Sequence, residues 1–176
     1  SFPTMKPEEY TLLCSARRTI ALSIGRDGTL IVRAPYGTTE RQIAPLLDRY
    51  AGWIETHRAR RAEIAEREMR LSDDDIRRLK KEARIRLTEK TAYYAAVMGL
   101  SYGKITITSA KSRFGSCSSA GNISYSYRLM LYPEKAWDYV VVHELAHLVE
   151  MNHSAAFYAV VARILPDYKE RRALLK

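Results

Sequence analysis

Residues 143–153 read His143-Glu144-Leu145-Ala146-His147-Leu148-Val149-Glu150-Met151-Asn152-His153. Three of the four histidines of the chain lie in this stretch, and the first two form an H-E-x-x-H pattern. Residues four apart lie about one turn apart on the same face of an α-helix, so His143 and His147 can donate to one metal ion. Neutral imidazole is a preferred ligand of zinc. The stretch therefore predicts a helix that carries a metal site.

The third histidine limits the length of this helix. His153 follows His147 by six residues, about 600° of helical rotation, so it can reach the same metal only if the helix ends between them. We expect the break at Asn152, because asparagine tolerates the left-handed conformation, and a new helix capped by Ser154. A site of three histidines leaves a position open for water, which is typical of catalytic zinc. We expect one zinc ion per chain, although other divalent transition metals can suit such a site.

Glu144 is expected to be the general base. It lies about 100° round the helix from His143, where its carboxylate can reach a metal-bound water without becoming a ligand. Two histidines on a helix with no metal are the plainer alternative. The metzincin pattern H-E-x-x-H-x-x-G-x-x-H is excluded, because Glu150 stands at its glycine position and no methionine follows Met151 for a Met-turn.

Upstream of the zinc helix, a second segment carries a resemblance to a known family. The run Lys111-Ser112-Arg113-Phe114-Gly115-Ser116-Cys117 resembles the K-S-R-W-G-S-C signature of the YgjP-like metallopeptidases, which are related to the SprT-like zinc proteases. The runs Tyr139–Leu148, Asn152-His153-Ser154 and Pro166-Asp167-Tyr168-Lys169 are similar to the same family, as are Arg33-Ala34-Pro35 and Trp53-Ile54. The resemblance implies a metal-dependent hydrolase with zinc on His143, His147 and His153 and with Glu144 as base.

Four further residues are candidates for binding the substrate. Lys111 and Arg113 lie in the glycine- and serine-rich loop, where they could anchor substrate or simply brace the loop. The oxyanion formed in hydrolysis needs a partner beyond zinc, for which Arg113, Tyr125, Tyr127 and a backbone N–H group are all open. Cys117 could be a ligand or a nucleophile, but a lone cysteine more often packs as a small apolar side chain.

Hydrophobic patterning predicts an α+β fold, and the family resemblance implies that its core is zincin-like. We expect a strand hairpin over residues 19–33 with its turn at Arg26-Asp27-Gly28, and a long helix from Thr39 to Arg70 that Pro45 kinks or delays. A helix from Ser72 to Gly99, a strand over residues 104–108 and an alternating strand over residues 123–131 should follow. A short antiparallel sheet then packs on the zinc helix, and Asp167 caps a last helix.

Length and composition limit the class of protein. The 176 residues predict one catalytic domain over residues 1–176, with a hairpin and helix lobe over residues 1–70 and the zincin-like core over residues 71–176. Two distant cysteines indicate no disulfide framework, and no run of 18 apolar residues or signal-like segment is present. We therefore expect a cytoplasmic protein without a membrane span. Composition leaves the oligomeric state open.

The net charge of +9 is spread over both halves of the chain. It is typical of a soluble basic surface, although it could also attract nucleic acid. The leading function is a zinc-dependent hydrolase of peptide bonds in peptide or protein substrates. One alternative is a zinc-dependent nucleotide or phosphoanhydride hydrolase, with Lys111, Arg113 and Arg128 binding anionic oxygens. Another is a DNA-associated protease or nucleic-acid-binding module, whose DNA binding would weaken steeply with salt.

Overall fold

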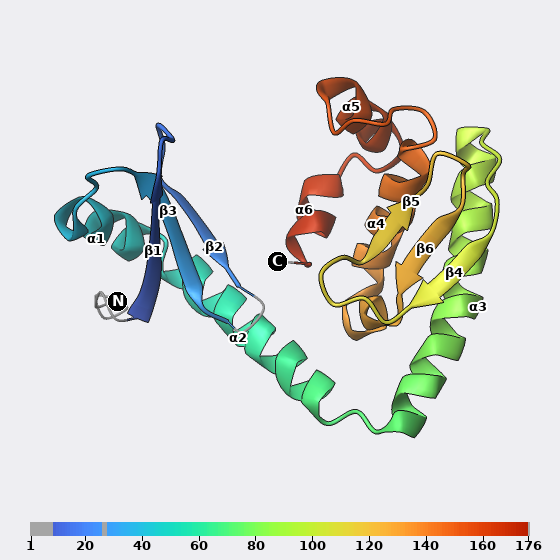
Figure 1. The fold of residues 1–176 in the computed structure, drawn as a ribbon, viewed down its shortest axis with the longest axis horizontal. Helices are drawn as coiled ribbons and strands as arrows, with labels where there is room; N and C mark the ends of the chain where they lie inside the picture. The colour runs from blue at the N-terminus through green and yellow to red at the C-terminus, as the bar shows by residue number, and fades with distance from the viewer. Residues whose placement is uncertain (1–8, 26–27, 176) are drawn as a thin grey trace. The chain divides into compact units, whose positions relative to one another are not determined.

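The computed structural model describes residues 9–25 and 28–175, which form a mixed α+β structure. The chain divides into two compact units, one up to Arg70 and the other from Leu71 to Leu175 (Figure 1). Each unit has its own three-stranded sheet. Within the described ranges, no helix combines the length and the apolar character that a membrane crossing requires.

The first unit is a small sheet with two helices. Its strands are β1 (Tyr10–Ser15), β2 (Ala21–Ile24) and β3 (Leu30–Pro35), in the order β1-β3-β2. Strands β2 and β3 pair antiparallel, which confirms the predicted hairpin, whereas β1 pairs parallel with β3. Of the predicted turn, Arg26 and Asp27 lie outside the described residues.

The predicted helix from Thr39 to Arg70 is two helices, α1 (Glu40–Arg49) and α2 (Ala51–Met69). Thr39 caps α1 as predicted, with its backbone N–H donating to the Gln42 side chain at 2.9 Å. The break falls at Tyr50 and not at Pro45, which lies inside α1. One helix was predicted because an apolar stripe continues across both helices, and this prediction was wrong. Its most buried members, Ile43, Leu47 and Ile54, join Ile24, Leu30 and Val32 in one core.

The second unit is built on the sheet β4-β6-β5. Strand β4 (Ile105–Thr108) pairs parallel with β6 (Ile123–Ser126), and β5 (Gly115–Cys117) pairs antiparallel with β6. The chain runs along β4, crosses to the far edge, returns along β5 and enters β6 through a turn at Gly121, whose φ is +83°. The expected all-antiparallel sheet is therefore wrong, since this crossover makes β4 and β6 parallel.

The predicted strand over residues 123–131 is a strand only as far as Ser126. Residues Tyr127–Leu131 form the 3-10 helix η2, which the Ser126 side chain caps by accepting from the Arg128 backbone N–H at 3.3 Å. The apolar residues after Ser126 are buried, so an alternating pattern that resembles a strand here marks a covered 3-10 turn. The three-residue β5 has too few residues for a periodic signal and was predicted as part of a loop.

Two helices, α3 (Asp73–Met98) and α4 (Glu134–Ala146), pack side by side on one face of this sheet (Figure 1). Ser72 caps α3 through reciprocal hydrogen bonds with Asp75, and Gly99 ends it in the left-handed conformation, both as predicted. The Thr91 hydroxyl on α3 lies 2.8 Å from the Tyr125 hydroxyl on β6, which fixes the helix to the sheet. Two shorter helices, α5 (Ala155–Ile164) and α6 (Tyr168–Ala173), then pack near α4.

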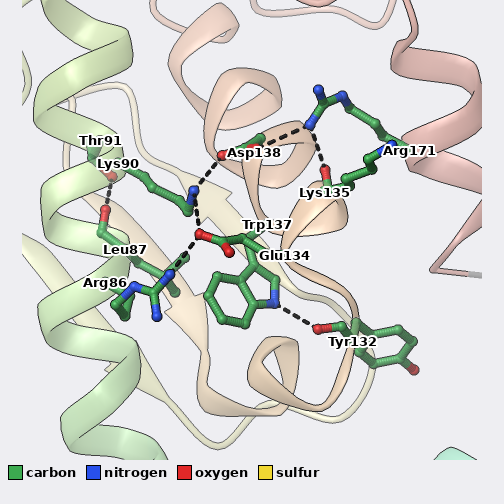
Figure 2. Close-up of polar contacts among 10 residues, drawn as sticks. All are labelled: Arg86, Leu87, Lys90, Thr91, Tyr132, Glu134, Lys135, Trp137, Asp138 and Arg171. Atoms are coloured by element: carbon green, nitrogen blue, oxygen red, sulfur yellow. Dashed lines mark hydrogen bonds and ion pairs between the residues drawn. The ribbon is translucent and has the colours of Figure 1, made fainter.

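A half-buried charge network joins α3, α4 and α6 (Figure 2). Lys90 donates to Asp138 at 2.8 Å and lies 3.1 Å from Glu134, while Arg86 lies 2.6 Å from Glu134. Arg171 reaches the other oxygen of Asp138 at 3.0 Å. Asp138 thus forms ion pairs with a lysine of α3 and an arginine of α6. Tyr139 is the next residue of α4. The network fixes the start of the helix that carries His143 and Glu144.

Candidate metal centre

Helix α4 is buried along most of its length and ends just before His147. The chain leaves it through short-range turns, with the Leu148 N–H donating to the Leu145 carbonyl at 3.0 Å, and α5 begins at Ala155. The predicted break between His147 and His153 is confirmed, as is the Ser154 cap, which accepts from the Phe157 N–H at 3.4 Å.

The expected break at a left-handed Asn152 is wrong, because α4 already ends at Ala146. Throughout residues 9–25 and 28–175, positive φ occurs only at glycines. His147, which caps the end of α4, has a φ of −64° and a ψ of −17°, so the helix ends without a left-handed residue.

The three histidines converge at one point. One ring nitrogen of each of His143, His147 and His153 lies within 4.8 Å of the others. His143 Nε2 and His153 Nε2 are 3.2 Å apart, and the ring centroids of the three imidazoles are 4.7–5.0 Å apart. In the part of the chain that the structure describes, this is the one group of three or more histidine, cysteine, aspartate or glutamate side chains close enough to share a metal ion.

The donor set fits a tetrahedral metal ion. Zinc–nitrogen bonds of about 2.05 Å at tetrahedral angles place neighbouring nitrogens about 3.3 Å apart, close to the His143–His153 separation. Ligand histidines must also be neutral. Burial lowers the pKa of His143 to about 4, with the neighbouring His147, His153 and Arg172 adding to the shift. Burial likewise lowers the pKa of His147. Both imidazoles are therefore ready to accept a metal at neutral pH.

An apolar ring fixes the base of the cluster. Phe157, the first buried residue of α5, has its ring centroid 4.9 Å, 4.6 Å and 5.0 Å from those of His143, His147 and His153. Because this ring is fully buried, it limits the rotamers that the imidazoles can adopt. The backbone groups of Glu150 and Met151 hydrogen-bond His147.

Glu144 lies beside the histidines but is not one of the cluster. Its Oε1 is 4.0 Å from His143 Nε2, and its side chain is only 7% exposed. Burial raises the pKa of Glu144 to about 7, and the positive charge of Arg113 opposes that rise. A carboxyl group with such a pKa can both accept and donate a proton near neutral pH.

The close approach of β5 to Glu144 depends on a glycine. A Cβ atom on Gly115 would lie 3.0 Å from Glu144 Cγ, 3.2 Å from Val140 Cγ1 and 3.2 Å from the Ser124 carbonyl oxygen. Only a residue without a side chain lets the edge strand lie this close to α4. This role was missed from sequence, although Gly115 lies inside the quoted loop motif.

Of the four candidate substrate residues, two are exposed and two are buried. Lys111 and Arg113 are exposed in the loop before β5, and the charge of Arg113 is felt by Glu144. Tyr125 is fully buried with its hydroxyl bonded to Thr91, so the expectation that it contacts substrate is wrong. Tyr127 is 2% exposed, with the cations of Lys80 and Arg128 at 5.7 Å and 5.3 Å from its ring centroid. Both tyrosines are core residues: Tyr125 on β6 and Tyr127 in η2 lie under helix α3.

Tyr139, which was not among the predicted site residues, contacts the cluster. Its hydroxyl lies 3.2 Å from His143 Nδ1, and the positive charge of Arg172 acts on it. The four-residue spacing between Tyr139 and His143 was a usable signal, because such pairs meet on one helix face. Cys117 is partly buried, and burial, with the charge of Glu144, raises the pKa of its thiol, so the thiolate is disfavoured.

Comparisons with known proteins identify the family of this chain. The family described as "YgjP-like, metallopeptidase domain" matches residues 71–176. One similar solved structure is the metallopeptidase zymogen abylysin of Pyrococcus abyssi, at 24% sequence identity and a TM-score of 0.45, over 48% of this chain and 87% of that chain. Compared with the curated proteins, the chain has no match.

Proposed function

The chain belongs to the YgjP-like metallopeptidase family, and from this premise we propose that it is a zinc-dependent peptidase. In this proposal His143, His147 and His153 bind the metal and Glu144 is the general base. One observation carries it: a buried carboxylate lies 4.0 Å from one nitrogen of a three-imidazole cluster. A base at this distance can reach a water at the open metal position without itself being a ligand.

The chemistry divides between the metal and the chain. When bound, zinc supplies a Lewis acid that lowers the pKa of water and polarises a carbonyl group. Glu144 accepts the proton of the attacking water on its carboxylate and delivers it to the leaving nitrogen. A pKa near 7 suits both transfers. Arg113, whose charge acts on Glu144, is our candidate for binding the carbonyl oxygen or the substrate backbone. Lys111 on the same loop is a second cationic candidate.

The substrate we propose is a peptide or protein, because the family is one of metallopeptidases. The same centre could in principle hydrolyse a phosphoanhydride, so peptides and nucleotides belong in one screen. We expect chelator-sensitive cleavage of peptides by the metal-loaded protein and no phosphate release from nucleotides. The opposite pattern would replace the peptidase proposal with a nucleotide hydrolase.

Glu144→Gln tests the mechanism directly. The amide keeps the shape of the side chain but cannot take a proton, so kcat should fall about 10²–10⁴-fold while zinc content stays unchanged. Zinc is measured by elemental analysis and kcat on the best peptide of the screen. Glu89→Gln, an exposed site on α3, is the matched control and should behave as wild type. Undiminished kcat in zinc-loaded Glu144→Gln would refute the role of Glu144.

A further inference from the structure

The two ring nitrogens of His143 have different partners. Nε2 faces Nε2 of His153 at 3.2 Å, whereas Nδ1 faces the Tyr139 hydroxyl at 3.2 Å. A neutral imidazole that binds a metal through Nε2 carries its proton on Nδ1. In that state Nδ1 donates and the oxygen of Tyr139 accepts. The hydroxyl is thus placed to select the tautomer in which Nε2 is free to bind a metal.

The positive charge of Arg172 on α6 acts on the same hydroxyl. Its guanidinium lies 5.7 Å from the ring centroids of both Tyr158 and Tyr168. Tyr168 in turn stacks on Tyr139 and Tyr158, with centroids 6.5 Å and 5.8 Å away. A guanidinium can only donate, so the charge of Arg172 favours a lone pair of the Tyr139 oxygen over its O–H on that side. The same oxygen can accept from His143 Nδ1 when a metal occupies Nε2.

Hydrogen bonds from Arg171, the residue before Arg172, fix how α6 packs on α4. Arg171 binds Asp138 at 3.0 Å and the Lys135 carbonyl at 3.2 Å (Figure 2). Neighbouring residues of α6 therefore act on neighbouring residues of α4: Arg171 binds Asp138, and the charge of Arg172 acts on Tyr139. Lys90 holds Asp138 from α3 at 2.8 Å. The position of the Arg172 guanidinium is thus determined by a network that spans three helices.

We propose that Tyr139 is a positioning residue for the metal ligand His143, and that Arg172 positions Tyr139. This inference rests on the proposed function, since it requires His143 to bind a metal. Ligand histidines commonly donate their second N–H to a carboxylate, which raises the basicity of the ligand. Here the acceptor is a neutral phenol beside a cation. It orients the ring without adding negative charge, which leaves the metal a stronger Lewis acid.

Zinc affinity tests the proposal without relying on activity. Wild type, Tyr139→Phe, Arg172→Gln and the double variant are titrated with zinc in competition with a chromophoric chelator. Loss of a hydrogen bond to a ligand histidine typically weakens metal binding about 10–100-fold, which we expect for Tyr139→Phe. Arg172→Gln should weaken it less. The double variant should resemble Tyr139→Phe, because Arg172 acts through Tyr139. Tyr93→Phe, at a tyrosine that is 63% exposed, is the matched control.

A second readout separates positioning from general stability. We expect the visible absorption bands of the cobalt-substituted protein to shift in Tyr139→Phe and to stay unchanged in Tyr93→Phe, with little change in thermal unfolding of the metal-free proteins. Wild-type affinity and spectrum in Tyr139→Phe would overturn the inference. If Tyr139→Phe does not fold, Arg172→Gln decides: a weaker zinc affinity supports the inference, and an unchanged affinity and spectrum overturns it. Failure of the wild type to bind zinc would instead refute the proposed function.

Discussion

At the scale of single residues, the environment of Glu144 decides its chemistry. An exposed glutamate is a weak base near neutral pH, but burial between α4 and the edge strand β5 raises the pKa of Glu144 to about 7. The positive charge of Arg113 opposes this rise. The burial in turn requires that β5 lie close to α4, which Gly115 permits.

Gly115→Ala should disturb this residue directly. The added methyl would lie 3.0 Å from Glu144 Cγ and 3.2 Å from a backbone oxygen, so either the carboxylate or the strand must move. Overpacking of this kind costs about 1–3 kcal/mol, measured by urea unfolding. We also expect a lower kcat at unchanged zinc content. Gly99→Ala is the control: no atom lies within 4 Å of its added carbon, but φ is +69°. It should lose stability and keep kcat. Full stability and kcat in Gly115→Ala would contradict the close contact.

The residues of the candidate centre differ in how far sequence could predict them. The convergence of His143, His147 and His153 follows from helical spacing and one helix break, because these are local properties. Tyr125 and Tyr127 looked equally available for substrate. Their burial depends on α3, which precedes them by some 30 residues, and no local pattern reports such a contact. Tyr139 needed no tertiary information, since it lies one turn before His143.

At the scale of elements, caps and glycines were predictable and strand identity was not. Ser72 and Gly99 begin and end α3 as predicted because capping chemistry is local. Strand β5 has three residues, too few to show a period, and exists because β6 and α4 hold it. The Tyr127–Leu131 segment carries strand-like alternation yet forms a 3-10 helix. Hydrophobic pattern alone therefore misassigns the elements whose secondary structure depends on tertiary contacts.

The contact between α3 and α4 predicts a pH dependence of stability. The hydrogen bond from Lys90, with its charge, lowers the pKa of Glu134 below its ordinary value of 4.5. A lowered carboxyl pKa stabilises the folded state above the unfolded value, and this stabilisation is lost as pH falls through the folded value. Because the Glu134 side chain is 53% exposed, solvent screens this pair. Lys90→Gln should therefore lower the free energy of unfolding by at most about 1 kcal/mol at pH 7, and the difference should shrink below pH 4.

The measurement is urea unfolding of both proteins between pH 3 and pH 7. Lys81→Gln is the matched control, because Lys81 is exposed on the same helix. It should differ little from wild type at any pH. A Lys90→Gln deficit that is as large at pH 3 as at pH 7 would show that the lysine acts through packing of its stem and not through its charge.

At the scale of the whole molecule, every residue of the proposed centre lies in the second unit. The ligands, Glu144, Gly115, Tyr139 and Arg172 all fall between Leu71 and Leu175, and the family match covers the same part of the chain. The first unit has its own buried core, formed by residues of β2, β3, α1 and α2. We propose that these units are separate domains, with the boundary between Arg70 and Leu71.

A fragment of residues 71–176 tests this boundary. It is about 100 residues long, within the usual size of an independent domain, and it begins one residue before the Ser72 cap, so α3 keeps its first turn. We expect one cooperative unfolding transition and a zinc affinity within about threefold of the full chain, since no ligand or ligand-supporting residue is removed. Residues 71–165 are the informative comparison, because they lack α6 and with it Arg172. The shorter fragment should bind zinc more weakly, by as much as Tyr139→Phe or more. If residues 71–176 fail to unfold cooperatively or lose more than tenfold in zinc affinity, the centre depends on the first unit and the boundary is wrong.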